Sequence, residues 1–168
     1  MKKVLLAIDG ITPDQKAFRY AVALCKRIRA ELSIFQIIRP RYYREYAKKV
    51  RKKAALARKF MEGSMVAATF AEAGEHETAM DIMADASKEI RRLLQESGES
   101  GVHCYFSIES ESPEKEIVNY VKKHRNVVLT IYDASDPDVN GAANISIKKN
   151  ALERIRKDLS VPLVTVHN

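Results

Sequence analysis

A continuous apolar run at the amino-terminal end of the chain, Val4–Ile8, is the feature that most constrains the fold. Asp9 and Gly10 follow it directly. An apolar run without polar alternation is typical of a strand that is buried on both faces, as in a parallel sheet covered by helices. Thr12–Gln15 is typical of a helix start, with Thr12 as the cap and a proline at the first helical position. Asp9 is therefore expected at the carboxyl end of a strand, where open α/β sheets bind their ligands.

The same alternation of strand and helix continues along all 168 residues. The predicted strands after the first are Glu31–Ile38, Val102–Glu109, Asn126–Tyr132 and Val161–Val166. The predicted helices cover about 13–29, a long region of about 41–97, a segment that begins at Ser112–Glu114, and Ser146–Leu159. This order predicts one α/β domain, an open parallel sheet with helices on both faces.

The net charge of +7 is concentrated in one segment. Residues 39–60 hold ten Lys and Arg residues against a single acidic residue, a net +9, so the rest of the chain carries −2. The segment has three interpretations: a solvated helix face or dimer-flanking arm, a surface for an acidic protein partner, or a nucleic-acid surface. Tyr42, Tyr43 and Tyr46 would permit base stacking in the last case.

Neither membrane insertion nor secretion is predicted. No apolar run reaches the length of a membrane-spanning helix, and the amino-terminal residues lack the long apolar region and cleavage site of a signal peptide. Cys25 and Cys104 lie in apolar surroundings without CxxC spacing, which favours buried, inert thiols in a cytoplasmic protein.

Several segments, in this order, resemble the universal stress protein family. They are KKVLLAIDG with the capped helix after it, AELSIFQIIRP, ESPEKEIVNYVKKH before NVVLTIY, and SVPLVTV. The resemblance implies a five-stranded sheet of order 3-2-1-4-5, a cytoplasmic stress-response role and a homodimer through the last strand, Val161–Val166. It covers 1–168 as one domain, with an extended basic helical insertion at about 40–75. Many members bind ATP, and Asp9 occupies the position of an acidic residue that helps them hold the adenosine.

The chain departs from the family after its fourth predicted strand. ATP-binding members carry G-x2-G-x9-G-S/T there, and its glycines let backbone N–H groups approach the phosphates. This chain has DASDPDVNGAANISIKKN, which retains only Gly141 and puts the third glycine position near Lys149. Its aspartates would repel a triphosphate unless a cation intervened. The candidate nucleotide contacts are Asp9, Gly10, Ile38, Asp133, Gly141, Lys148, Lys149 and Asn150.

The acidic loop also contains a D-x-D-x-N-G pattern, formed by Asp136, Asp138, Asn140 and Gly141. Alternate oxygen ligands before a glycine turn are the way in which a calcium loop surrounds its ion. The twelfth position holds Ile147 instead of a bidentate glutamate, and a strand precedes the loop. The pattern therefore has two interpretations, a Mg²⁺ or Ca²⁺ site and a polar turn rich in Asx hydrogen bonds.

No catalytic residue is predicted. The four histidines have no metal-ligand spacing, and no serine lies in a nucleophile elbow. The sequence predicts a non-enzymatic, homodimeric stress-response or regulatory module without tight ATP binding. Two alternatives are an adenine-nucleotide-binding member with a divergent phosphate loop and at most slow ATP hydrolysis, and a scaffold that binds through residues 39–60.

Overall fold

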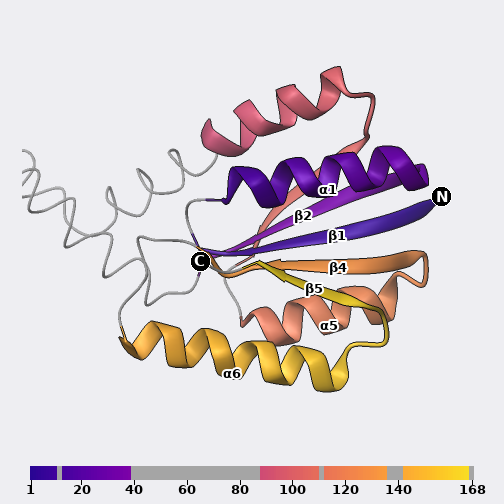
Figure 1. The fold of residues 1–168 in the computed structure, drawn as a ribbon. Coiled ribbons are helices and arrows are strands. Elements are labelled where there is room, and N and C mark those ends of the chain that lie inside the picture. Colours follow the sequence, from indigo (N-terminus) through magenta and orange to yellow (C-terminus); the bar gives the residue numbers. More distant parts are fainter. Residues whose placement is uncertain (11–12, 39–87, 110–111, 136–141, 167–168) are drawn as a thin grey trace, which may run out of the picture.

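A five-stranded parallel sheet forms the centre of the computed structural model (Figure 1). The structure describes residues 1–10, 13–38, 88–109, 112–135 and 142–166. The strands are β1 (Lys2–Asp9), β2 (Ala30–Ile37), β3 (Cys104–Glu109), β4 (Val127–Asp133) and β5 (Leu163–Val166). Their order in the sheet is β3-β2-β1-β4-β5, which confirms the predicted 3-2-1-4-5 topology.

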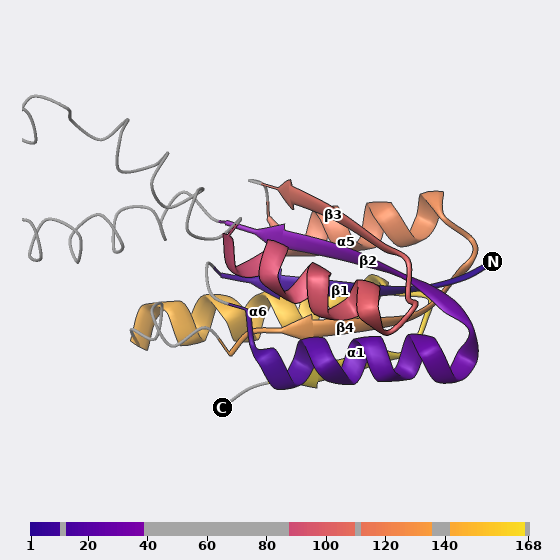
Figure 2. The same cartoon turned by 90° about the horizontal axis from the view of Figure 1, so that it is seen from above.

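Helices cover both faces of the sheet. One face carries α1 (Gln15–Ile28) and a helix over residues 88–99, and the other carries α5 (Pro113–Lys123) and α6 (Ala142–Asp158) (Figures 1 and 2). Each helix enters the fold near the carboxyl ends of the strands and runs back toward their amino ends. The amino-terminal ends of α1, α5 and α6 therefore lie near the carboxyl ends of the strands (Figure 1). We refer to this end of the sheet as the carboxyl edge, or ligand edge.

The predicted double burial of the first strand is confirmed. Val4, Leu6 and Ile8 pack in the core on the α1 side, and Leu5 and Ala7 pack in the core on the α5 and α6 side. All five side chains are at most 1% exposed. Burying a Val, Leu or Ile side chain stabilises the fold by about 1.5–3 kcal/mol. A polar side chain in this run would lose that stabilisation, so the strand has no polar alternation.

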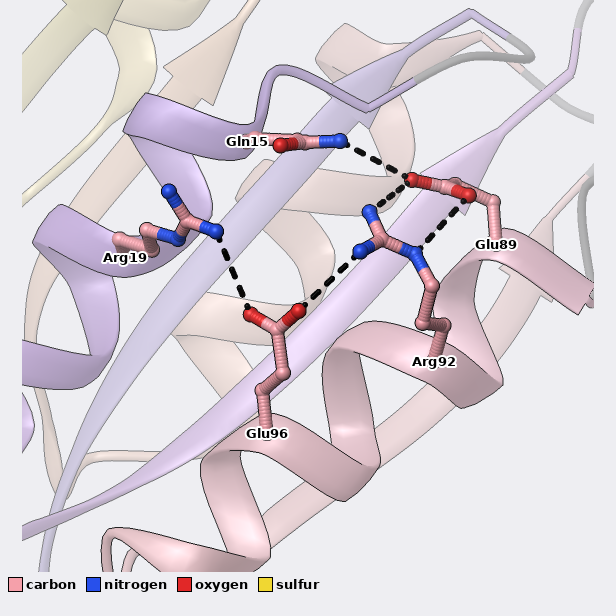
Figure 3. Close-up of polar contacts among 5 residues, drawn as sticks. All are labelled: Gln15, Arg19, Glu89, Arg92 and Glu96. Carbon is pink, nitrogen blue, oxygen red and sulfur yellow. Dashed lines mark hydrogen bonds and ion pairs between the residues drawn. The ribbon is translucent and has the colours of Figure 1, made fainter.

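The 88–99 helix is joined to α1 across the surface by a chain of polar contacts (Figure 3). Arg92 is central, because its guanidinium contacts one glutamate on each side within its own helix. The contacts are Arg92–Glu89 at 2.6 Å, Arg92–Glu96 at 3.1 Å, Arg19–Glu96 at 3.7 Å and Gln15–Glu89 at 3.4 Å. The Gln15 contact brings this network to the first turn of α1, beside the carboxyl edge of the sheet.

The start of α1 differs from the prediction. Asp14 is the N-cap, and its Oδ1 accepts a hydrogen bond from the Ala17 N–H at 2.9 Å. The helix therefore begins at Gln15, and Pro13 precedes the cap instead of occupying the first helical position. Aspartate is as strong an N-cap as threonine or stronger, and the sequence offered both within three residues.

Other element ends differ from the predictions by a few residues. The cap position of α5 is Ser112 as predicted, but its side chain makes no capping hydrogen bond. The strands β3 and β5 each begin two residues later than predicted, and α6 begins four residues earlier, at Ala142. Local sequence signals locate an element more reliably than its ends.

Several predictions lie outside the described residues. They are the basic segment 39–60 with the insertion at about 40–75, and the loop residues Asp136, Asp138, Asn140 and Gly141. Within the described part of the chain, no helix is long and apolar enough to span a membrane.

Candidate functional site

The predicted site residues of three strands meet at the carboxyl edge of the sheet. Asp9 pairs in register with Ile37 of β2, and Ile8 pairs with Asp133 of β4. Ile38 follows β2 directly, is fully buried and donates its N–H to the Glu109 carbonyl oxygen at 2.9 Å. The fold therefore brings Asp9, Ile38 and Asp133 to one edge, although they are far apart in the sequence.

Asp9 lies on the face of the sheet that α5 and α6 cover. Its side chain is fully buried, and its Oδ2 accepts a hydrogen bond from the hydroxyl of Tyr132. Tyr132 is itself 1% exposed and packs in the core beside Leu5 and Ala7. The aromatic ring thus belongs to the core, while its hydroxyl donates a hydrogen bond to the Asp9 carboxylate at the ligand edge.

Gly10 turns the chain away from the sheet directly after Asp9. Its φ of 148° lies in a region that residues with a side chain rarely adopt, so the turn requires glycine. The Gly10 N–H donates to the Ile37 carbonyl at 3.1 Å, and the Gln36 Nε2 donates to the Gly10 carbonyl at 3.3 Å. These two bonds join the turn after β1 to the end of β2.

Asp133 lies on the opposite face, toward α1. Its Oδ2 accepts from the Asp14 N–H at 2.9 Å, and its Oδ1 accepts from the Ser135 N–H at 3.0 Å and from the Ser135 hydroxyl. Asp133 is 2% exposed. Burial raises its pKa above the ordinary value of 3.8, and the charge of Asp14 acts in the same direction, whereas the hydrogen bonds lower the pKa.

The three predicted contacts from α6 behave differently from one another. Lys148 is 7% exposed, and its Nζ donates to the Ala134 carbonyl oxygen at 2.9 Å, beside the end of β4. Lys149 and Asn150 are exposed. Only Lys148 is therefore held against the edge that carries Asp133.

Sequence reasoning missed three members of this edge: Asp14, Tyr132 and Ser135. The sequence predicts only a strand at Tyr132, although the alternation of Thr130 and Tyr132 with Ile131 and Asp133 places the tyrosine on the same face as Asp9. It predicts a helix start at Asp14 and a loop at Ser135. Their roles depend on contacts with Asp133, and no local pattern reveals the contact between residues 14 and 133.

The chemistry of this edge is that of buried acceptors held by neutral donors. Tyr132, Asp14 and Ser135 supply the donors, and Lys148 donates to the carbonyl of Ala134, the residue that follows Asp133. In the part of the chain that the structure describes, no three His, Cys, Asp or Glu residues are grouped closely enough to hold a metal ion. The edge is thus arranged for hydrogen bonding.

The fold and this edge define a member of a family of small α/β proteins. The model of the universal stress protein family matches residues 1–131. The chain therefore belongs to the universal stress protein family. The match ends directly before Tyr132, so the region from Tyr132 through α6 and β5 lies outside it.

Solved structures of this family have the same fold. A universal stress protein UspA from Lactobacillus plantarum is 15% identical with a TM-score of 0.61, covering 98% of this chain and 97% of its own. A universal stress protein from Archaeoglobus fulgidus is 8% identical with a TM-score of 0.55, with coverages of 98% and 93%. A universal stress protein in complex with cAMP is 11% identical with a TM-score of 0.51, with coverages of 99% and 96%. No curated protein sequence is significantly similar to this chain.

Proposed function

We propose that the chain is a non-enzymatic regulatory module of the universal stress type that does not bind ATP tightly. The observation that supports this proposal is the state of the Asp133 carboxylate at the carboxyl end of β4. Asp133 is buried and accepts hydrogen bonds from Asp14 and Ser135. A triphosphate that approached it would meet negative charge, and these donors are already bound to the carboxylate.

The sequence of the following loop supports the same proposal. It replaces the glycines of ATP-binding members with aspartates and keeps only Gly141. Lys148 is a possible phosphate contact by charge, but its Nζ is hydrogen-bonded to the Ala134 carbonyl. A phosphate would have to compete with that bond.

Thermal denaturation with and without 1 mM Mg·ATP tests the proposal. A ligand present at 100 times its dissociation constant adds about 2.7 kcal/mol of stability, or about 5–10 °C for a chain of this size. We expect no shift beyond that given by equal concentrations of Mg·CTP, the matched control. A saturable shift specific for ATP would contradict the proposal and favour the adenine-nucleotide alternative.

The second candidate function is the binding of an adenine nucleotide with fewer charges. It is favoured by the similar universal stress protein that was solved in complex with cAMP. A cyclic monophosphate carries a single negative charge and would meet less repulsion from Asp133 than ATP. Calorimetric titration with cAMP, with cGMP as control, tests it, and an equal response to both would contradict it.

We further propose a homodimer that forms through β5. This strand is an edge of the sheet, because β4 is its only described neighbour, and all four of its side chains are partly exposed. Edge strands with apolar side chains and unpaired backbone groups favour pairing with a second chain. A cytoplasmic stress-response role fits this assembly and the family.

The basic segment 39–60 keeps its alternative role as a surface for nucleic acid or an acidic protein. Nucleic-acid binding predicts an affinity that falls steeply with salt, because counterions are released from the phosphates. The electrophoretic mobility shift of a nucleic acid is measured with the full chain and with a variant lacking residues 41–60. The comparison shows whether this segment binds the nucleic acid. Equal shifts for both proteins would contradict a role of this segment.

A further inference from the structure

Asp133 is a buried carboxylate that three neutral donors hold. The donors are the backbone N–H of Asp14, the backbone N–H of Ser135 and the hydroxyl of Ser135. The Asp14 donor contacts Oδ2, and both Ser135 donors contact Oδ1. In the described part of the chain, no cation forms an ion pair with Asp133, although its side chain is only 2% exposed.

Such a donor set resembles the sites where proteins bind free anions. Backbone N–H groups at the start of a helix, with a hydroxyl beside them, bind phosphates, sulfates and carboxylates. The helix here is α1, with 14 residues, and the N–H of its third residue, Ala17, is bound by the Asp14 carboxylate. At Asp14 and Ala17, side chains of the protein thus act as the acceptors that ligand anions provide elsewhere.

We propose that Asp133 is a specificity-determining residue, a built-in anion that occupies an anion-binding position between the end of β4 and the start of α1. By filling this position it excludes the phosphate or carboxylate group of a ligand from the edge. This inference rests on the proposed weak ATP binding and identifies the residue that causes it. It also explains why the chain buries a carboxylate without a cation, an arrangement that is unfavourable unless it has a role.

The test is to remove the built-in anion and offer a free one. Asp133→Ala keeps Cβ and removes a carboxylate of the size of formate, so the donors of Asp14 and Ser135 lose their acceptor. Thermal denaturation of this variant is measured in sodium formate, sodium phosphate and sodium chloride at equal ionic strength. The controls are the wild type and Asp158→Ala, which removes the same charge from an exposed residue at the other end of α6.

We expect formate to raise the midpoint of Asp133→Ala by about 3 °C relative to chloride, while both controls shift by much less. A rise with formate alone would limit the excluded group to a carboxylate, and a rise with both anions would extend it to phosphate. If the variant is unfolded in chloride, the same titration is followed as recovery of the helical circular dichroism signal. No recovery would then count against the proposal.

The two failures are distinguishable. An equal response of Asp133→Ala and the controls to formate would overturn the role of Asp133, whether or not ATP binds to the wild type. Tight ATP binding by the wild type would overturn the proposed function, because it is measured without any variant. A formate response together with tight ATP binding would show that Asp133 fills an anion position but does not exclude the nucleotide.

Discussion

The carboxylate of Asp133 accepts a hydrogen bond from the backbone N–H of Asp14 at 2.9 Å, across 119 residues of sequence. This bond joins the end of β4 to the start of α1. It also places two carboxyl groups near each other, since Asp14 uses its own side chain to cap the helix. The charge of Asp14 and the burial of Asp133 therefore act together to raise the pKa of Asp133.

The raised pKa of Asp133 predicts a pH dependence of stability. Between the ordinary value of 3.8 and the raised pKa, the folded state binds more protons at this group than the unfolded state. The contribution of Asp133 to the free energy of unfolding consequently falls as pH rises through this window, by at most about 1.4 kcal/mol per pH unit. In Asp133→Asn this group no longer titrates, so the stability of the wild type minus that of the variant should decrease with pH.

Urea denaturation at pH values from about 4 to 7 measures this difference. Asp158→Asn is the matched control, because it removes an equal charge from an exposed aspartate. A wild-type advantage over Asp133→Asn that stays constant or grows as pH rises would contradict the raised pKa.

Tyr132→Phe should destabilise the protein by about 1–3 kcal/mol, because it removes a donor from the buried carboxylate of Asp9. The ring remains, so core packing is retained. The control is Tyr105→Phe, since that side chain is 55% exposed. Equal midpoints for the two variants in urea would show that the Tyr132 hydroxyl contributes nothing to Asp9.

Thr130→Val should have the opposite effect. Thr130 is fully buried on the same face of β4 as Tyr132, and its hydroxyl has no hydrogen-bond partner among the residues that the structure describes. Replacing the hydroxyl by a methyl group of similar size removes an unsatisfied polar group, so we expect a gain of about 1 kcal/mol. Thr130→Ser, which keeps the hydroxyl, is the control. A Thr130→Val variant less stable than the wild type would indicate a partner for this hydroxyl.

The sheet could be predicted from the sequence, because its strands are short apolar or β-branched segments separated by amphipathic helices. Val4–Ile8 shows the reason: a short run of five apolar residues followed by a turn signal is typical of a central strand covered on both faces, and all five side chains are buried. The family resemblance supplied the strand order, which apolar runs alone do not determine. Cap assignment failed at Thr12 because two capping residues compete within three positions, and their local energies are similar.

The site was only half predictable. Asp9 and Asp133 could be placed at the ligand edge, because each directly follows a predicted strand of a parallel sheet, and each ends the strand that the structure shows. Their partners could not, since Tyr132 reaches Asp9 across 123 residues and Asp14 reaches Asp133 across 119. Such contacts depend on which face each side chain takes and on the exact end of α1, and a one-residue error in either changes the partner.

The contacts in Figure 3 should give a small, salt-dependent stabilisation. Glu89→Gln removes the acceptor charge from Arg92 and keeps the shape of the side chain. We expect the thermal midpoint to fall by about 1–2 °C at low salt, and the difference to vanish in about 1 M NaCl. The control is Glu99→Gln on the same helix, and a loss that persists at high salt would contradict an electrostatic origin.

The same pair has a defined pH dependence. The hydrogen bond from Arg92 lowers the pKa of Glu89 below its ordinary value of 4.5. A lowered folded-state pKa stabilises the protein above the unfolded value, and this contribution is lost as pH falls below 4.5. The difference between the wild type and Glu89→Gln should therefore shrink on acidification, in the direction opposite to that expected at carboxyls with a raised pKa.

The proposed dimer can be tested at one backbone N–H. The carbonyls of Pro162 and Val166 accept hydrogen bonds from Thr130 of β4 and from Ala134, which follows β4 directly. Residues of a parallel strand alternate in the side toward which their N–H and C=O point, so Thr165 points away from β4, to the open edge. Thr165→Pro removes that donor without removing a bond to β4.

Sedimentation equilibrium should give twice 19.0 kDa for the wild type and 19.0 kDa for Thr165→Pro. Thr165→Val is the control, because it keeps the backbone N–H and should remain dimeric. An unchanged circular dichroism spectrum of Thr165→Pro would show that the monomer is folded. A wild type that is monomeric at about 100 μM would contradict the dimer, because a dimer with a micromolar dissociation constant would be nearly complete there. A dimeric Thr165→Pro would place the interface away from the backbone edge of β5.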